Sequence, residues 1–428
     1  MSDLGLNQRL SDFVQAAVTP FHAVAVMARQ LEQSGYTRVH EADVWDLKGG
    51  ARYYTTRNDA SIVAWQMPRQ KAPADAGFRM IGAHTDSPCL KVKPNPEIQR
   101  NGYWQLGVQV YGGVLLNPWF DRDLSLAGRV TYRTQAGGLA SDLVNFEHPI
   151  ATIPNLAIHL DREANSGRKV NPQTMVTPIL AIRDEAFNFK SMLRDHMCDR
   201  GLDVAQVLDF DLSFYDTQAP SFIGLQREFF ASARLDNLLS CFMGLEALVN
   251  CDSEQGALLV CNDHEEVGSM SASGAQGPML EQVLRRICPD QESHVRMLAN
   301  SMLISADNAH GIHPNFADKH DAGHGPLLGA GPVIKINANQ RYATNDLTSG
   351  LFRQFAVQAG VEIQAFVMRQ DMACGSTIGP ITSAELGVKT IDIGVPQFAM
   401  HSIRELAASA DVASTIKVLD VFLAADAV

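Results

Sequence analysis

The residues best suited to catalysis in this chain are histidines and acids that follow apolar segments. His84 follows FRMIGA, Glu266 follows ALLVCNDHE, Asp307 follows MLISA, and His401 follows IDIGVPQFAM. In open α/β sheets, ligands bind beyond the carboxyl ends of the strands, where distant parts of the chain meet. A fifth residue, Asp236, is expected to open a helix after SAR, a position that capping and the helix dipole also favour. We expect these five side chains to converge on one site.

Two histidines and three carboxylates suit Zn²⁺, Co²⁺ or Mn²⁺ and match copper or iron–sulfur chemistry poorly. If two ions are held, one carboxylate must bridge them, and Asp236 is the candidate bridge. His84 and Asp307 then complete one ion's ligands, and Glu266 and His401 the other's. Two ions about 3.5–4 Å apart polarise a carbonyl and lower the pKa of a shared water. The pattern therefore predicts a metal-dependent hydrolase.

Two adjacent glutamates, Glu265 and Glu266, suggest a division of roles. Neighbouring acids cannot easily both face one metal, so one can bind an ion while the other takes a proton from the attacking water. In the HTD triplet, Asp86 can hold the free ring nitrogen of His84 and fix its tautomer. Each of these residues also has a common structural role, as a core histidine, a solvated acid or a helix cap. Their shared placement at strand ends favours the catalytic interpretation.

Other motifs point away from nucleotide binding and serine chemistry. The stretch GHGPLLGAG at 323–331 precedes the strand-like PVIKIN, whereas a phosphate loop needs a following helix N-terminus. No GxSxG elbow occurs, and GSTIG at 375–379 has threonine at the nucleophile position. A further group of histidines is expected to form a polar loop beside the site: His310, His313, His320 and His324.

Composition predicts a globular protein of two domains. With 428 residues, 46% of them hydrophobic and 19% charged, the chain exceeds one typical core. Its net charge of −12 disfavours nucleic acid as a partner. The first 20 residues lack the apolar run of a secretory signal, and no run of about 18 apolar residues suggests a membrane span. Seven scattered cysteines without a CxxC pair favour a reducing cytoplasm.

The order of elements predicts an α/β fold with an insertion. Helical periodicity in the first 35 residues is followed by strand-like ARYYTT, SIVAWQM and FRMIGAH. From about Pro94 the chain becomes rich in Gly, Asn and Pro, and VQVYGG, GRVTYR and PILAIR are typical of antiparallel strands. Helices and apolar strands alternate again after this stretch. We predict a layered catalytic domain with a mixed, largely parallel sheet over 1–93 and 234–428, interrupted by a smaller β-rich domain over 94–233.

Set side by side, these segments resemble the aspartyl aminopeptidase family, which includes the yeast vacuolar aminopeptidase. The resemblance runs in one order from about residue 80 to 405. It is carried by IGAHTDSPCLKVKP, NPWFDRDLSLAGRV, IPNLAIHLDR, RLDNL, DHEEVGS, SADNAHGIHPNF, GPVIKINANQRYATN, CGSTIGPI and DIGVPQFAMHSIRE.

The resemblance implies a dinuclear zinc aminopeptidase with Glu265 as the base and Asp86 orienting a ligand histidine. It implies five metal ligands: His84, Asp236, Glu266, Asp307 and His401. It also implies that the inserted domain mediates dimerisation, that dimers assemble into a tetrahedral homododecamer, and that His159 reaches a neighbouring subunit's site. Lys335 matches a basic residue associated with acidic side chains of the substrate.

The expected activity is removal of an N-terminal residue, preferably Asp or Glu, from peptides. An aminopeptidase of broad or neutral specificity is the alternative, because metal ligands do not select the side chain. A catalytically silent assembly protein is a third hypothesis, and the intact set of ligands and base disfavours it.

Overall fold

A computed structural model describes residues 3–182 and 186–428, and the chain divides into two compact units. Unit 1 comprises Met1–Asp86, Pro220–Met400 and Glu405–Val428, and unit 2 comprises Ser87–Ala219 and His401–Arg404. The insertion predicted over 94–233 thus differs at its ends from unit 2. Residues 220–232 fall in unit 1 because the strand at 229–232 pairs with residues 405–408, near the C-terminus, and the strand at 221–223 pairs with it in turn.

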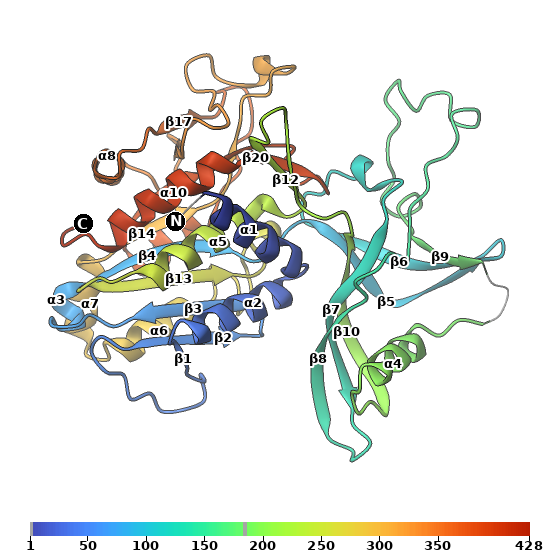
Figure 1. The fold of residues 1–428 in the computed structure, drawn as a ribbon, viewed down its shortest axis with the longest axis horizontal. Coiled ribbons are helices and arrows are strands. Elements are labelled where there is room, and N and C mark those ends of the chain that lie inside the picture. Colours follow the sequence, from blue (N-terminus) through green and yellow to red (C-terminus); the bar gives the residue numbers. More distant parts are fainter. Residues whose placement is uncertain (1–2, 183–185) are drawn as a thin grey trace. The chain divides into compact units, whose positions relative to one another are not determined.

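The central feature of unit 1 is a nine-stranded sheet of order β1-β2-β3-β13-β4-β14-β18-β16-β17 within the described residues (Figure 1). Its four central strands, β13, β4, β14 and β18, are mutually parallel. Antiparallel pairs join β2 to β3, β3 to β13 and β18 to β16, which confirms the predicted mixed, largely parallel sheet. The strands are β1 (Thr37–Arg38), β2 (Arg52–Arg57), β3 (Ser61–Gln66), β4 (Phe78–His84), β13 (Gly256–Asn262), β14 (Met302–Ala306), β16 (Val333–Ile336), β17 (Gln364–Val367) and β18 (Lys389–Gly394).

Helices cover both faces of this sheet because its central strands are apolar on both sides. Ile81 and Leu259 pack in one core, whereas their neighbours Met80 and Leu258 pack in another, as alternation along a strand requires. The first core includes residues of α1 (Asp3–Ala16), α2 (Pro20–Gln33), α5 (Leu235–Asn250), α8 (Asp346–Ala359) and α10 (Ser409–Leu423). The second core includes residues of α3 (Pro73–Ala76), α6 (Met279–Ile287) and α7 (Gln291–Ala299), and α9 (Ile378–Leu386) contacts β4, β14 and β18.

Caps fix where several of these helices begin. Pro20 is the first residue of α2, and Thr19 caps that helix by accepting from the backbone of His22. Asn345 and Thr348 form a capping box at the start of α8.

A second, five-stranded sheet of unit 1 has the order β11-β12-β20-β19-β15. It joins residues that lie far apart in sequence: β11 (Ser221–Ile223), β12 (Phe229–Ser232), β15 (Ala309–His310), β19 (Pro396–Phe398) and β20 (Glu405–Ala408). β12 leads directly into α5, and β15 follows β14. This sheet therefore fixes the segments that carry Asp236 and Asp307.

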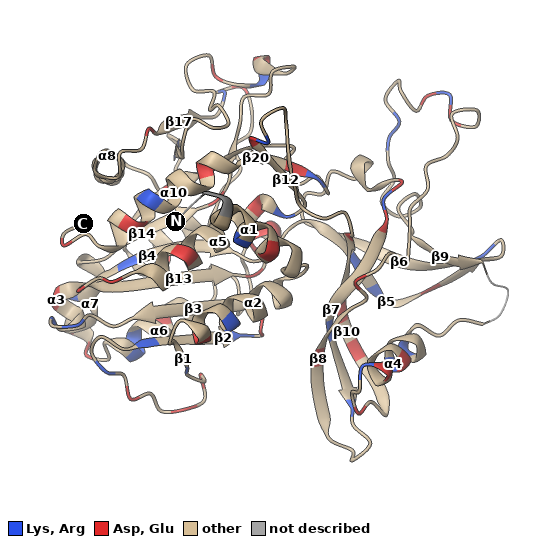
Figure 2. Ribbon diagram, in the orientation of Figure 1, with Lys and Arg blue, Asp and Glu red and all other residues tan. Residues whose placement is uncertain are grey.

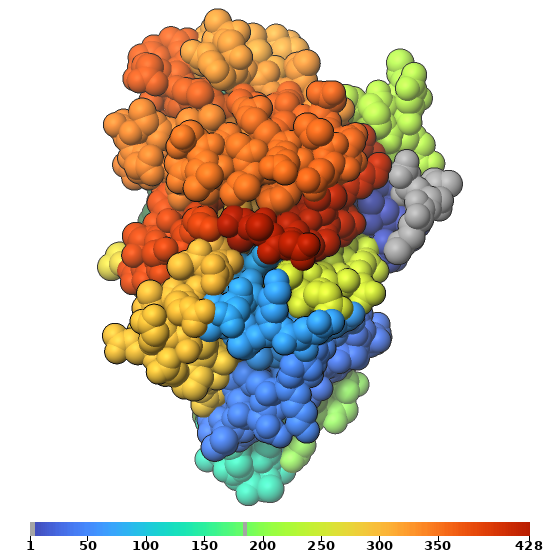
Figure 3. Space-filling view, turned by 90° about the vertical axis from the view of Figure 1, so that its left-hand side faces the viewer, coloured from blue at the N-terminus to red at the C-terminus, as the bar shows by residue number. Residues whose placement is uncertain are grey.

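The C-terminus is tied to β4 by one buried arginine. The guanidinium of Arg79 donates to the carbonyl oxygens of Ala425 and Asp426 at 2.8 and 2.6 Å, and to Ala76 O at 2.8 Å. In Figure 3 the dark red C-terminal residues lie beside the light-blue segment near residue 80. These bonds satisfy carbonyls that follow α10 and hold that helix against the sheet.

Unit 2 is built on a six-stranded antiparallel sheet of order β8-β7-β10-β5-β6-β9. Its strands are β5 (Cys89–Arg100), β6 (Tyr103–Tyr111), β7 (Leu124–Arg133), β8 (Leu139–Asn145), β9 (Ile179–Ile182) and β10 (Gln206–Asp216), with α4 (Phe189–Asp199) packed through Phe189, Leu193 and Met197. VQVYGG, GRVTYR and PILAIR contribute to β6, β7 and β9, apart from Arg183, which lies outside the described residues. Unit 2 has the β-rich character that the sequence predicted.

Charged residues of both signs are spread over each of the two units (Figure 2). Within the described part of the chain, every helix is too short or too polar to cross a bilayer.

At Gly394, β18 passes so close to the segment after β14 that a side chain has no room there. A Cβ at Gly394 would lie 2.0 Å from Asp307 O and 2.8 Å from Ala309 N, both backbone atoms. We expect Gly394→Ala to lower the free energy of unfolding by about 3 kcal/mol, the upper range for overpacking. Gly350→Ala in α8 is the control, since nothing lies within 4 Å of its Cβ position, and alanine there should stabilise by up to about 1 kcal/mol. Equal thermal midpoints for both variants would contradict the close approach.

Candidate metal centre

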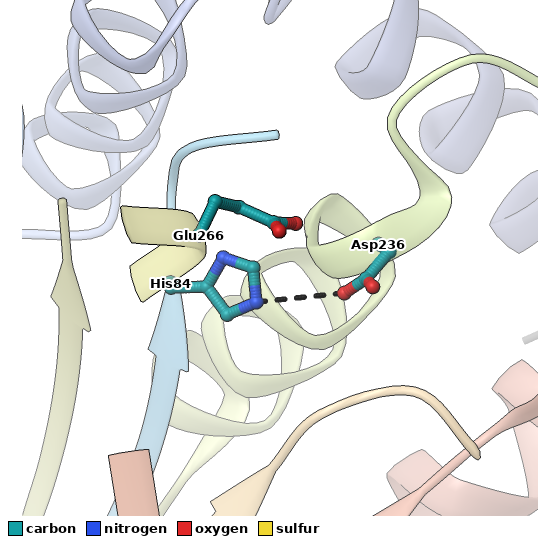
Figure 4. A group of neighbouring side chains, drawn as sticks. All are labelled: His84, Asp236 and Glu266. Carbon is teal, nitrogen blue, oxygen red and sulfur yellow. Dashed lines mark ion pairs between the residues drawn. The ribbon is translucent and has the colours of Figure 1, made fainter. Parts of the chain in front are cut away.

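His84 is the last residue of β4, and its buried ring faces acids from three other segments. His84 Nε2 lies 3.4 Å from Asp236 Oδ1 and 3.7 Å from Asp307 Oδ1. Ligand atoms of His84, Asp236 and Glu266 all lie within 4.8 Å of one another. Figure 4 shows these three side chains pointing toward one another from the end of β4, the start of α5 and the short helix after β13.

Asp236 sits where α5 departs from helical geometry. Its backbone angles are φ −83° and ψ 106°, and its peptide bond to Asn237 is cis. The Asp236 N–H donates to Glu405 Oε2 at 3.0 Å, and Asn237 Nδ2 donates to Ala306 O at 2.8 Å. Side chains of β20 and α5 thus tie the irregular start of the helix to both sheets of unit 1.

Asp86 links the histidine to the two glutamates. Its carboxylate oxygens accept from the backbone N–H groups of Glu265 and Glu266, each at 3.1 Å, at the start of a 3₁₀ helix, η2 (Glu265–Val267). His84 Nδ1 lies 3.0 Å from Asp86 O and 3.3 Å from Asp86 Oδ1. One carboxylate therefore orients the imidazole and also positions the loop that carries Glu265 and Glu266.

Burial and the neighbouring aspartates raise the pKa values of Glu265 and Glu266. Burial, then repulsion from Asp236, raises the pKa of Glu266 well above its ordinary value. Burial likewise raises the pKa of Glu265 to about 7, with Asp307 and Asp236 adding to the effect. Burial disfavours protonated His84, but hydrogen bonds to Asp236 and Asp307 outweigh this effect and raise its pKa. A group of buried carboxylates around one imidazole fits divalent cations, which would offset the repulsion between the acids.

Lys335 lies behind Asp307 on β16. Its Nζ is 3.3 Å from Asp307 Oδ2 and 3.2 Å from Asp307 O. Burial alone would lower the pKa of Lys335, yet the Asp307 carboxylate overcomes this effect and raises it. The ammonium is therefore charged and directed at a predicted metal ligand.

A cavity of about 250 Å³ opens in unit 1 and is bordered by His310. Burial lowers the pKa of His310 to about 4, and the charge of Lys335 lowers it further, so the imidazole is neutral at pH 7. The other lining residues are largely apolar or histidine: Gly311, His313, Lys319, His320, Phe366, Met368, Met372, Gln397, Phe398, Ala399 and Met400. Three of the four histidines expected beside the site border this cavity. Its apolar lining comes from β17, β19 and the segments that follow them, and no motif in the sequence indicated it.

Two predicted site residues belong to unit 2. His401 has φ 69°, and its Nδ1 lies 3.1 Å from Gly113 O. His159 is exposed, within an exposed stretch from 154 to 160. Their roles at the centre stay predictions. Glu405 and Asn308 were not singled out in the sequence, because nothing in their spacing reveals that they hold the segments of Asp236 and Lys335.

Comparison with known proteins gives the centre its family context. Residues 13–423 match the family described as aminopeptidase I zinc metalloprotease, M18. A probable M18 family aminopeptidase 2 of Pseudomonas syringae pv. tomato is 60% identical over 422 residues, which is 98% of this chain and 98% of that protein.

Two solved structures of yeast relatives share the fold. The crystal structure of yeast aminopeptidase 1 is 27% identical with a TM-score of 0.86, covering 98% of this chain and 97% of that one. A structure described as an mApe1 dodecamer of S. cerevisiae is 28% identical with a TM-score of 0.84, covering 97% and 95%. With a match over nearly its whole length and a buried group of histidine and acids at the strand ends, the chain belongs to the M18 family of zinc metalloproteases and is an aminopeptidase.

Proposed function

We propose that the protein removes N-terminal residues from peptides with two divalent ions, most simply Zn²⁺, and that Glu265 is the general base. The observation that carries this proposal is the convergence of His84, Asp236 and Glu266 within 4.8 Å, with Asp307 beside them. In this proposal Asp236 would contribute to both ions and His401 would be the fifth ligand. Held there, two ions would supply polarisation of the scissile carbonyl and would lower the pKa of the attacking water.

In this proposal the protein's own residues orient the reactants and move one proton. Asp86 holds His84 in one tautomer and fixes the backbone of Glu265. Glu265 takes a proton from the attacking water and delivers it to the leaving amine. Burial raises the pKa of Glu265, and bound cations would lower it.

Replacing the base tests this division of labour. We expect Glu265→Gln to lower kcat by about 10²–10⁴-fold, the usual contribution of a positioned base. Zinc content should stay at the wild-type level, because the amide replaces a residue that is not a ligand. Glu281→Gln serves as the control, since Glu281 is an exposed acid paired with Arg285 on α6. Wild-type kcat in metal-loaded Glu265→Gln would show that another residue is the base.

We propose a preference for N-terminal Asp or Glu, as the family resemblance implies. Lys335 supports this preference, because its positive charge lowers the pKa of His310, which lines the wall of the cavity. Lys319 lines the same cavity and supplies a second cation. A carboxylate placed there would be attracted by both lysines and by the metal ions.

A specific observation favours the second candidate, an aminopeptidase for neutral residues. Phe366, Met368, Met372 and Phe398 give the cavity an apolar wall, and the pKa values of His310 and His320 are lowered by burial. Neutral imidazoles and thioethers suit an uncharged side chain.

Hydrolysis of Asp-, Glu- and Leu-anilides by the purified protein separates the two specificities. The acidic proposal predicts a higher kcat/KM for the Asp and Glu substrates than for Leu. A preference for Leu of about tenfold, or about 1.4 kcal/mol in the transition state, would overturn it. Raising the ionic strength should lower kcat/KM for the Asp- and Glu-anilides but not for Leu-anilide, because salt screens the attraction between charges.

We further propose that unit 2 mediates dimerisation and that dimers form a dodecamer, in line with the yeast mApe1 dodecamer. Unit 2 exposes apolar side chains, whose contact with water is unfavourable: Leu139 and Ile182 are each 74% exposed, and Leu160 is 75% exposed. His159 lies beside Leu160 and is the proposed contribution to a neighbouring subunit's site.

Light scattering of the purified protein measures this assembly directly. A dodecamer is the expected species, and Leu160→Asp should shift it toward smaller forms by placing a charge on the apolar surface. Leu225→Asp, at a fully exposed site of unit 1, is the control and should leave the size unchanged. A wild-type monomer would contradict both the assembly and the role of His159.

A further inference from the structure

The side-chain ammonium of Lys335 donates hydrogen bonds to oxygens of the protein itself. Its side chain is 5% exposed, and its Nζ lies 3.1–3.3 Å from three oxygens: Asp307 O, Asp307 Oδ2 and Asn308 O. An ammonium group has three N–H donors, so these acceptors match its full number. Tyr342 covers it further, with its ring centroid 5.0 Å from Nζ.

The two carboxylate oxygens of Asp307 face different partners. Oδ2 accepts from Lys335, whereas Oδ1 lies 3.7 Å from His84 Nε2. A carboxylate is free to rotate about its bond to Cβ unless a partner fixes it. Lys335 holds one oxygen and thereby directs the other toward the centre.

The same ammonium also connects to the segment of the proposed bridging ligand. Asn308 O accepts from Lys335, and Asn308 Nδ2 donates to Leu235 O and to Gln397 Oε1, each at 2.8 Å. Leu235 immediately precedes Asp236 in the chain. Lys335 thus stabilises the loop after β14, and that loop in turn holds the start of α5.

We propose that Lys335 is a positioning residue for the metal centre, acting through Asp307 and Asn308 on every substrate, whatever its N-terminal side chain. This inference rests on the proposed function, because it takes Asp307 and Asp236 to be metal ligands. Lys335 would then have two roles. One is the long-range attraction of acidic residues, and the other is a short-range role that does not depend on the substrate.

Lys335→Met tests the proposal, because methionine keeps most of the length and removes the donors and the charge. Groups that orient metal ligands typically contribute 10–100-fold in metal affinity or activity, so we expect an apparent zinc dissociation constant about 10–100-fold higher in a competition titration with a chelator. At saturating zinc, kcat should fall by the same factor for Asp- and Leu-anilides, with the ratio of their KM values unchanged. Lys389→Met is the control, since Lys389 is the first residue of β18, at the end opposite Gly394, and donates to Val428 O.

The opposite pattern would overturn the inference. Zinc affinity and Leu-anilide kcat within about twofold of wild type, with KM raised for Asp-anilide alone, would assign Lys335 to substrate recognition only. A chain that does not fold as either Lys335→Met or Lys335→Gln would assign it to fold stability and would also overturn the proposal. Asp307→Asn provides a second measure: the double variant with Lys335→Met should lose less zinc affinity than the sum of the two single losses, because part of the effect of Lys335 passes through the Asp307 carboxylate. Fully additive losses of zinc affinity would show that Lys335 does not act through Asp307.

Zinc content of the wild-type chain separates this proposal from the one on which it rests. Wild-type protein without bound zinc would remove the proposed function itself. Wild-type protein with two zinc ions and an unaffected Lys335→Met variant would remove only the role of Lys335.

Discussion

The burial of several carboxylates around a single imidazole is the constraint on which the rest of the centre depends. Asp86, Asp236 and Asp307 are buried next to His84, and Glu265 and Glu266 stand beside them. Isolated buried charges are costly, and removing water from like charges that lie close together is more costly still. Lys335 offsets part of this negative charge, and divalent cations would offset much of the rest.

The scaffold brings these acids together through parallel strands that end at one edge of a sheet. His84 is the last residue of β4, Asp307 directly follows β14, and Glu266 lies in the loop that follows β13. Parallel neighbours place their carboxyl ends side by side, so three segments far apart in sequence become adjacent without long loops. Gly394 allows β18 to approach the backbone of Asp307 so closely that a side chain would not fit between them.

Sequence patterns predicted the sheet and the convergence of His84, Glu266 and Asp307, because apolar strands followed by polar residues are a local signal. They could not assign Glu265 and Glu266 separate roles, since adjacent residues share one sequence context, and that distinction came from the family resemblance. The contact between Lys335 and Asp307 depends on β16 and β14 being brought close by tertiary structure, and the sequence alone shows only a lysine within a strand. The predicted insertion ends at 233, beyond the end of unit 2, for a similar reason: residues 229–232 pair with β20, a partner near the far end of the chain.

Anomalous diffraction from crystals of the zinc-loaded protein tests the dinuclear centre most directly. Two anomalous peaks about 3.5–4 Å apart are expected, with the carboxylate of Asp236 between them and His84 and Glu266 on different ions. A single peak, or two peaks that Asp236 does not bridge, would contradict a dinuclear centre bridged by this carboxylate.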